Sequence, residues 1–248
     1  MANVRPLYIP TPSQEPADSG ALILRDGTTA VIRVTRPDDQ SALEAFVDRL
    51  SPEAKRHRFF SETTPPADVI RSLCDSSDPR SKLTLIVTRV WQGAPRIIAA
   101  GSYLAKDDTT AEVAMAVDDA FHGRGLGTLL LERLALLAIR HGFVRLWAVT
   151  HADNVAMREV FRESGYEARE SYDGSNIEVE LSVAPTEASV TRAEVRDRIA
   201  TIASLRPFFR PRSVAVIGAS RDPASIGYRL VQALVGNRFQ GAVYPVNP

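Results

Sequence analysis

Several features are scarce or absent in this sequence. Cys74 is the only cysteine among the 248 residues, so the chain cannot form an internal disulfide or a zinc site built from several cysteines. No apolar run approaches the ~20 residues of a membrane-spanning helix, and the sequence does not begin with the basic stretch and apolar core of a signal peptide. These absences predict a cytoplasmic protein with no membrane partner.

An excess of charge of one sign is also absent. The 30 basic residues balance the 30 acidic ones, which argues against bulk attraction to nucleic acid. The four histidines are scattered without a metal-binding spacing such as HxxxH, so we expect no metal site. What is present is typical of a soluble globular protein, with 44% hydrophobic and 24% charged residues, in a length that suits one large or two smaller domains.

Residues 21–183 alternate between strand and helix signals. Polar and apolar alternation, or an apolar run bounded by turn residues, predicts a strand, and apolar residues three to four apart predict a helix. The expected strands cover 28–36, 83–90, 96–105, 111–117, 143–151, 166–172 and 177–183, and the expected helices cover 38–50, 51–60, 66–74, 126–141 and 154–164. This order predicts an α/β or α+β fold in which helices flank a mixed, mostly antiparallel sheet.

The two ends of the sequence differ from this middle part. Residues 1–20 are rich in Pro, Ser and acidic residues and are expected to form a disordered tail. Residues 184–211 are interpreted as a linker with a helix that begins at a capping box of Thr191 and Glu194. Residues 212–248 predict a Rossmann-like strand–helix–strand unit. Because a nucleotide-type domain needs several such units, we expect 212–248 to be the start of an incomplete domain.

The segment HGRGLGT, residues 122–128, joins the strand at 111–117 to a leucine-rich helix. The first turn of a helix leaves backbone N–H groups without partners, and with the helix dipole these groups attract anions. Gly123, Gly125 and Gly127 would let a phosphate approach the backbone, and Arg124 could add positive charge. Because short glycine motifs are weakly specific, a glycine-rich turn without a ligand is the alternative.

Two common phosphate-binding motifs do not fit this segment. A dinucleotide fingerprint needs a parallel strand–helix–strand start and an acidic residue about 20 positions later, where this chain has HGFVRLW. A P-loop needs Gly-Lys-Ser or Gly-Lys-Thr, which HGRGLGT lacks. The glycine segment therefore belongs to another class of phosphate site, if it is one.

The strand before the glycine segment carries an acidic residue among small ones. In AEVAMAV, alternation places Glu112, Ala114 and Ala116 on one face and Val113, Met115 and Val117 on the other. A carboxylate within an apolar strand is costly to bury unless it is paired or used. Glu112 is therefore expected to be paired or to have a function, and a solvent-exposed edge position is the alternative.

Together these segments resemble the GNAT acetyltransferase superfamily. HGRGLG is similar to the family's pyrophosphate motif (Gln or Arg, two residues, Gly, one residue, Gly or Ala), with His122 as a departure in the first position. NVAMREVFRESGY resembles the family's late helix, with Asn154 as a pantetheine contact. Many members have Tyr, which can protonate the leaving thiolate, where this chain has Phe161.

Two longer stretches resemble particular members of the superfamily and a domain that is fused to them. IRVTRPDDQSALEAFVDRLSPEAKRHRFF looks like the start of Pat-type protein lysine acetyltransferases. Residues 213–248 are similar to the opening of the CoA-binding domain of NDP-forming acyl-CoA synthetases, a module that Pat-type enzymes fuse to a GNAT domain. The resemblance implies transfer of acetyl from acetyl-CoA to a protein lysine, with acyl-CoA synthetases among the expected targets, and a synthetase-like domain that continues beyond this chain.

The resemblance also assigns residues. Glu112 is expected to accept the proton of the lysine amine, directly or through a water, and a backbone N–H near Met115 to stabilise the oxyanion. No metal cofactor is implied. The residues expected to bind acetyl-CoA are Met115, Ala116, Val117, Gly123, Arg124, Gly125, Leu126, Gly127, Thr128 and Asn154.

Three other functions stay open at this point. A GNAT enzyme for a small-molecule amine would use the same loop and base. A CoA-sensing or acyl-CoA-sensing regulatory module is compatible with Phe161 but not readily with Glu112. An acyl-CoA ligase would need synthetase domains that this sequence lacks.

Overall fold

A computed structural model describes residues 19–247 of the chain. Its backbone divides into two compact units, residues up to 200 and residues from 201 onward. No helix within the described residues is both long and apolar enough to cross a bilayer. The predicted tail lies outside the described residues, except that residues 19 and 20 begin a strand, where the prediction was wrong.

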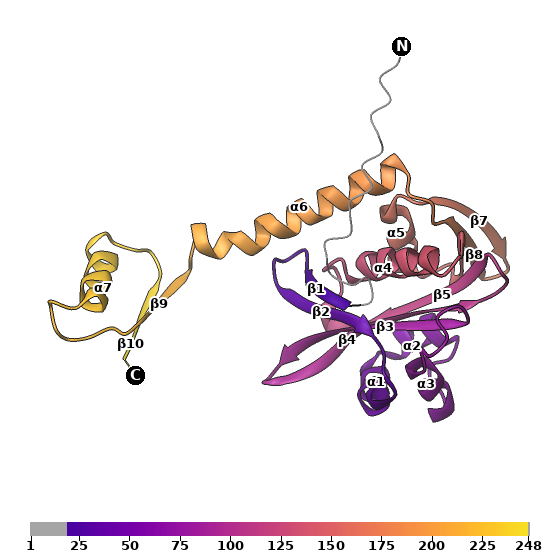
Figure 1. Cartoon of the computed structure of the whole chain (residues 1–248), viewed down its shortest axis with the longest axis horizontal. Helices are drawn as coiled ribbons and strands as arrows, with labels where there is room; N and C mark the ends of the chain where they lie inside the picture. The colour runs from indigo at the N-terminus through magenta and orange to yellow at the C-terminus, as the bar shows by residue number, and fades with distance from the viewer. Residues whose placement is uncertain (1–18, 248) are drawn as a thin grey trace, which may run out of the picture. The chain divides into compact units, whose positions relative to one another are not determined.

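The first unit is built on one eight-stranded sheet in the order β1-β2-β3-β4-β5-β6-β8-β7 (Figure 1). All neighbours are antiparallel except β5 and β6, which are parallel. This confirms the predicted mixed, mostly antiparallel sheet. The strands are β1 (Ser19–Ile23), β2 (Thr29–Val34), β3 (Lys82–Trp91), β4 (Ala94–Ala105), β5 (Thr110–Val117), β6 (Arg145–His151), β7 (Glu167–Asp173) and β8 (Asn176–Ser182).

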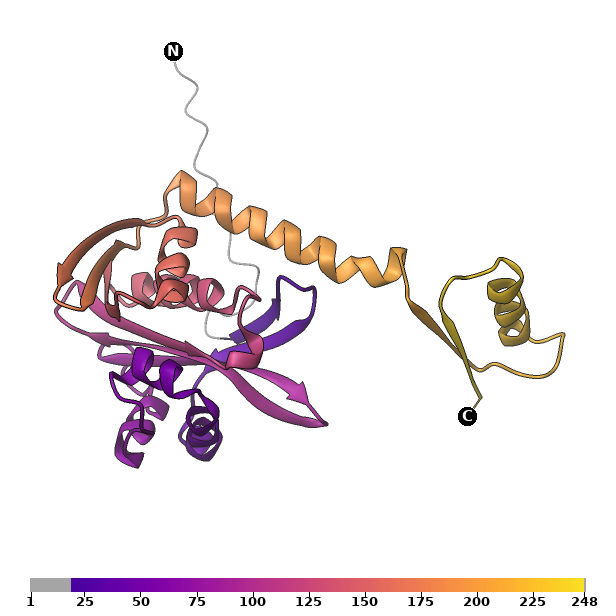
Figure 2. The ribbon, with the colours of Figure 1, turned by 180° about the vertical axis from the view of Figure 1, so that it is seen from behind.

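Helices cover both faces of this sheet. Figures 1 and 2 show α1, α2 and α3 on one face and α4 and α5 on the other. The helices of this unit are α1 (Gln40–Arg49), α2 (Pro52–Phe59), α3 (Ala67–Cys74), α4 (Leu126–Arg140) and α5 (Val155–Ser164), with short 3₁₀ turns η1 (Pro37–Asp39) and η2 (Asp119–Phe121).

Two apolar cores follow from this layering. The larger one lies between the sheet and α4, whose Leu130, Leu131 and Leu134 are fully buried. The smaller one packs α1 and α3 against the opposite face through residues such as Phe46 and Ile70. Each fully buried aliphatic or aromatic side chain contributes about 1.5–3 kcal/mol, so the two cores fix the position of β5 and of the segment that follows it.

Helix α6 (Glu187–Phe209) begins earlier than the sequence predicts. Thr191 lies inside the helix, so the capping box predicted at Thr191 and Glu194 is wrong. The reciprocal bonds occur instead between Thr186 and Ser189: the Ser189 N–H donates to Thr186 Oγ1 at 3.0 Å, and the Thr186 N–H donates to Ser189 Oγ at 2.9 Å. The sequence contains two possible capping pairs, Thr186 with Ser189 and Thr191 with Glu194, and the helix begins at the first of them.

The second unit contains a parallel pair of strands and one helix. β9 (Ser213–Ile217) pairs with β10 (Ala242–Val246), and α7 (Ile226–Gly236) connects them. Ser225 caps α7 by accepting a hydrogen bond from the Tyr228 N–H at 3.2 Å. This is the strand–helix–strand unit that the sequence predicts.

Candidate functional site

Strands β5 and β6 separate at the centre of the sheet. Among the described residues they pair only along Thr110–Glu112, although β5 continues to Val117 and β6 to His151. Beyond Glu112 the two parallel strands therefore diverge and leave a wedge-shaped opening in the sheet. An extended ligand could enter this opening edge-on and hydrogen-bond to a strand, as a peptide does when it adds to a sheet edge.

The backbone of β5 presents hydrogen-bonding groups to the opening. The Asp118 N–H donates to the Ile98 carbonyl on β4 at 2.9 Å, and successive residues of a strand turn their N–H and C=O groups to opposite edges. Met115 and Val117 precede Asp118 by an odd number of residues. Their N–H and C=O groups therefore point to the other edge of β5, toward the gap. Two residues predicted to contact acetyl-CoA thus have backbone groups in a suitable place.

The three glycines of the loop after β5 have two different roles. Gly123 and Gly125 have φ of 73° and 80°, the left-handed region, and no atom lies within 4 Å of a Cβ built on either. A Cβ on Gly127 would instead lie 2.8 Å from Val160 Cγ2 on α5. Gly127 therefore allows α4 and α5 to pack closely, whereas Gly123 and Gly125 leave open space above the first turn of α4. That open space is what an anion-binding loop requires, and the phosphate site itself stays a prediction.

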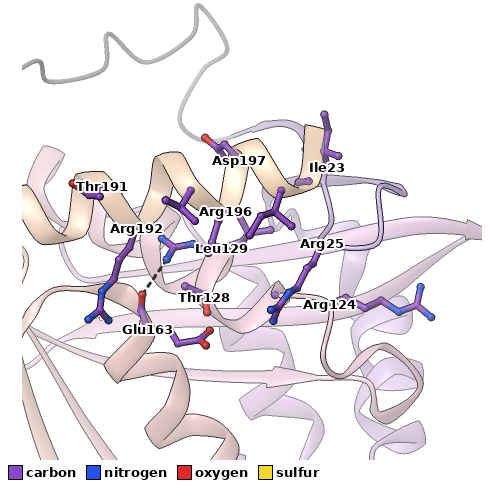
Figure 3. A pocket seen from close by; sticks show the side chains of 14 residues that line it. Ile23, Arg25, Arg124, Thr128, Leu129, Glu163, Thr191, Arg192, Arg196 and Asp197 are labelled. Carbon is purple, nitrogen blue, oxygen red and sulfur yellow. Dashed lines mark hydrogen bonds between the residues drawn. The ribbon is translucent and has the colours of Figure 1, made fainter. Parts of the chain in front are cut away.

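Arg124 does not point over this open space. Its guanidinium pairs with Asp26 at 2.8 Å and lies 5.0 Å from the centre of the Phe121 ring, and Figure 3 shows it directed away from the loop. The residue beside it in space is Arg25, whose backbone N–H donates to the Arg124 carbonyl at 3.2 Å. Sequence analysis missed Arg25 because the turn that carries it is about 100 positions away in the chain.

His122, the departure from the family motif, has a structural contact. Its Nε2 lies 3.0 Å from the Val117 carbonyl oxygen, to which it donates. Asp118 and Asp119, which come shortly before His122, hold the start of the glycine segment in place. Buried Asp118 pairs with Arg96 at 2.6 Å and with Arg49 at 3.5 Å. Asp119 binds the Ser51 hydroxyl at 2.8 Å. Burial would raise the pKa of Asp119, but the hydrogen bonds from Ser51 outweigh it and lower that pKa below its usual value.

Glu112 lies on the face of β5 that α2 covers, and it is exposed. Its carboxylate makes no hydrogen bond or ion pair within residues 19–247. On the same face Arg58 of α2 donates to the buried hydroxyl of Ser102 at 2.8 Å. Burial lowers the pKa of Arg58 to about 10 and the Glu112 carboxylate opposes that shift, so the guanidinium remains charged at neutral pH near an accessible carboxylate.

The basic run KRHR, residues 55–58 on α2, makes specific contacts with acidic and polar groups. Arg56 pairs with Asp153 at 2.7 Å, and His57 Nε2 lies 3.3 Å from the same carboxylate. Hydrogen bonds from Arg56 are the main reason that the pKa of Asp153 is lowered. Only the three-dimensional position of α2 over β5 and the β6–α5 loop reveals these contacts.

Asn154 and Phe161 occupy structural positions. The Asn154 side chain caps α5 by accepting from the Met157 N–H at 3.0 Å, and its amide donates to Thr150 Oγ1 at 3.0 Å. These bonds leave one amide hydrogen for the predicted pantetheine contact. Phe161 is 2% exposed within the larger core, and its ring cannot donate a proton. Cys74 is buried too, and burial raises the pKa of its thiol to about 11.

No group of three or more His, Cys, Asp or Glu side chains with a geometry suited to a metal ion occurs in the described part of the chain. The chemical groups gathered around the opening are backbone amides, a glycine loop, the Glu112 carboxylate and the Arg58 guanidinium. This set offers backbone hydrogen bonds to an extended ligand, open space for an anion and an accessible carboxylate.

Comparisons with known proteins agree with this geometry. Residues 47–166 match the model of the acetyltransferase (GNAT) family, and residues 212–248 match the model of a CoA binding domain. The chain is similar to a curated acetyltransferase of Pseudomonas aeruginosa, with 27% identity over 153 residues that cover 61% of this chain and 82% of that protein.

A solved structure and a second curated protein extend the comparison. The GNAT domain of S. lividans PAT has 29% sequence identity and a TM-score of 0.61 to this chain, with 68% of this chain and 99% of that domain covered. An ADP-forming acetate–CoA ligase of Archaeoglobus fulgidus is 54% identical over 48 residues. These residues are 19% of this chain but only 7% of the ligase, too little to carry over the ligase's activity.

Proposed function

We propose that this chain, an acetyl-CoA-dependent N-acetyltransferase whose residues 47–166 match the model of the GNAT family, acetylates the ε-amine of lysine side chains in proteins. The resemblance of residues 32–60 to Pat-type protein lysine acetyltransferases supports a protein acceptor, as does the similarity to the GNAT domain of S. lividans PAT. Metabolic enzymes such as acyl-CoA synthetases are the proposed targets.

The observation that carries this proposal is the accessible carboxylate of Glu112 beside the opening between β5 and β6. The pairing register places Trp147 of β6 and Glu180 of β8 on the same face of the sheet as Glu112. Glu178 lies on this face as well, opposite Val149. Glu180 is paired with Arg145 at 3.9 Å, whereas Glu112 and Glu178 make no ion pair within residues 19–247 and can attract a lysine ammonium from solvent. The phosphate loop is at the far end of the opening.

Acetyl-CoA supplies an activated acetyl group when it is bound. The chain's residues fit it: the open space above Gly123 and Gly125 suits the pyrophosphate, and the edge of β5 at Met115 and Val117 suits the amide-bearing pantetheine arm. These contacts hold the thioester near the point where β5 and β6 separate, next to Glu112.

Glu112 then performs the proton transfer. A lysine amine has an ordinary pKa of about 10.4 and is protonated at neutral pH, so it must lose a proton before its nitrogen can attack the thioester carbonyl. The Glu112 carboxylate accepts this proton, directly or through a water. The new C–N bond forms, and the carbonyl oxygen gains negative charge opposite the Met115 N–H, which donates to it.

The C–S bond breaks in the second half of the reaction. The electron pair returns to the carbonyl, the sulfur leaves as a thiolate, and the nitrogen of the new amide loses its second proton to solvent. Phe161 has no proton to give, so the thiolate is protonated by solvent after it leaves. Acetyl-lysine and CoA are the products.

The test is to incubate the chain with isotope-labelled acetyl-CoA and a cell lysate, and to locate acetyl-lysines by mass spectrometry. Glu112→Gln removes the proposed base, and Glu170→Gln on the exposed strand β7 is a control with the same charge change. We expect labelled lysines with the wild-type chain and Glu170→Gln but not with Glu112→Gln. Labelling of added small-molecule amines without any labelled protein would instead support the small-amine alternative.

A further inference from the structure

Trp147 lies directly beside Glu112 on the face of the sheet that carries α1, α2 and α3. The two residues are register partners where β5 and β6 run parallel, so their side chains lie on the same face. The helices of this face pack on β3, β4 and β5, and the indole of Trp147 on β6 stays half-buried. Trp147 belongs to neither apolar core. Its large ring is therefore available to a molecule that approaches Glu112 from solvent.

Carboxylates lie on both sides of this ring. Glu112 is its neighbour on β5 and Glu180 is its register partner on β8. Glu178 lies on the same face of β8, two residues from Glu180. The negative charges draw cations toward this part of the sheet, and the face of an indole attracts a cation as well. An aromatic ring between carboxylates has the chemistry of a site for an alkylammonium group.

A lysine of the chain itself already lies on the ring. The Lys106 Nζ is 3.1 Å from the centre of the Trp147 ring, well within the ~6 Å over which a cation and an aromatic face attract each other. Within residues 19–247 this ammonium makes no ion pair and no hydrogen bond. The position of Lys106 therefore shows that a lysine ammonium fits over Trp147, next to Glu112.

The turn that carries Lys106 is held by its own backbone. The Lys106 N–H donates to the Thr110 carbonyl at 2.9 Å. The Asp107 carboxylate accepts hydrogen bonds from the N–H groups of Thr109 and Thr110, both at 2.8 Å. The Lys106 side chain is exposed and is attached to the sheet through the ring alone. It can therefore leave Trp147 by side-chain rotation while the turn stays in place.

We propose that Trp147 is a platform for the ammonium of the acceptor lysine, and that Lys106 occupies this platform until an acceptor displaces it. The inference rests on the proposed function, because it names the residue that receives the lysine of that reaction. The acceptor side chain lies across the indole with its ammonium beside Glu112. Because the ring attracts the charged amine, Trp147 binds the acceptor before Glu112 removes the proton. Trp147 thus determines specificity for a cationic amine and acts on the affinity for the acceptor, not on the chemical step.

The first test measures KM and kcat for a lysine peptide at saturating acetyl-CoA. Trp147→Leu removes the aromatic face and keeps an apolar side chain. We expect KM for the peptide to rise about two- to fivefold, the effect of one exposed cation–π contact, with kcat within about twofold. Lys106→Gln removes the competing ammonium and should lower KM by at least about twofold. Lys106→Arg keeps a cation on the ring, and Lys82→Gln removes the same charge elsewhere, so both should keep the wild-type KM.

The double variant separates competition on the ring from a general effect of charge. In the Trp147→Leu background, Lys106→Gln should no longer lower KM, because the two ammonium groups have no ring to compete for. An equal fall in KM with and without the ring would contradict the proposal. An unchanged KM in both single variants, or a fall in kcat without a rise in KM for Trp147→Leu, would overturn it as well.

A second test reads Trp147 directly and needs no acetyl transfer. Trp91 is the other tryptophan of the chain, so the fluorescence of the double variant Trp91→Phe/Lys106→Gln reports on Trp147 alone, free of Lys106. The lysine peptide should change this emission, and the same peptide with norleucine in place of lysine should not. An equal response to both peptides, or to neither, would refute the platform. A response to the lysine peptide alone, in a chain that acetylates no lysine, would refute only the proposed function.

Discussion

Gly127→Ala separates the packing role of the third loop glycine from the binding role of the first two. The new Cβ would lie 2.8 Å from Val160 Cγ2, closer than carbon atoms can approach, so α4 and α5 must shift or Val160 must change rotamer. Overpacking of this kind costs about 1–3 kcal/mol, and replacing glycine by alanine in a helix returns about 0.5–1 kcal/mol. We expect a net loss of about 1 kcal/mol in the free energy of unfolding, roughly 2–4 °C in Tm for a unit of this size.

The matched substitution is Gly125→Ala. Its Cβ meets no atom within 4 Å, but its φ of 80° is unfavourable for alanine, a strain of about 1–2 kcal/mol. The two variants should therefore lose similar stability for different reasons. Gly125→Ala also places a methyl group in the space assigned to the pyrophosphate and should weaken acetyl-CoA binding by about tenfold or more, whereas Gly127→Ala should keep the Kd within about twofold.

The assay combines urea unfolding with acetyl-CoA titration. Adding Val160→Ala should restore the stability of Gly127→Ala with a coupling energy of about 1 kcal/mol, and should not restore Gly125→Ala. If Gly127→Ala abolished binding and Gly125→Ala preserved it, the division of the glycines into packing and binding positions would be refuted.

Three further predictions concern stability. Asp118→Asn should lower the free energy of unfolding by about 2 kcal/mol in urea titration, because hydrogen bonds to charged groups contribute about 1.5–3 kcal/mol and two arginines lose their partner. The Arg33 guanidinium lowers the pKa of Asp39 below its ordinary 3.8; the resulting stability is present above pH 3.8 and lost as the pH falls through the lowered pKa, so Asp39→Asn should flatten the acid side of the stability profile. Thr186→Ala should cost about 1 kcal/mol and speed hydrogen exchange at the start of α6, as should Ser189→Ala.

Much of the sheet could be predicted because its strands have simple patterns. Residues 83–87 of β3 form a mostly apolar run that is buried on both faces because helices cover both sides of the sheet, and in β5 small or acidic residues alternate with larger apolar ones. β1 was missed because SGALI is short and follows a polar stretch. The pair Asp26–Gly27 was an available signal, since this dipeptide is typical of a hairpin turn and Gly27 has a φ of 80°.

The candidate site was predictable only where its residues are adjacent in sequence. The glycine loop and Glu112 lie within 17 residues of one another, from Glu112 to Thr128, so one short segment contained both. Arg25 and Arg58 reach the site from other elements. Their positions depend on how β1, β2 and α2 pack on the sheet, and no local pattern in the sequence encodes that.

The most direct test of the central claim is the single-turnover rate of acetyl transfer to a lysine peptide by Glu112→Gln at saturating acetyl-CoA. A positioned general base contributes about 10²–10⁴-fold to a rate. We predict a fall of at least about a hundredfold, with the Kd for acetyl-CoA within about twofold of the wild-type value. A rate close to that of the wild-type chain would contradict the assignment of Glu112 as the base.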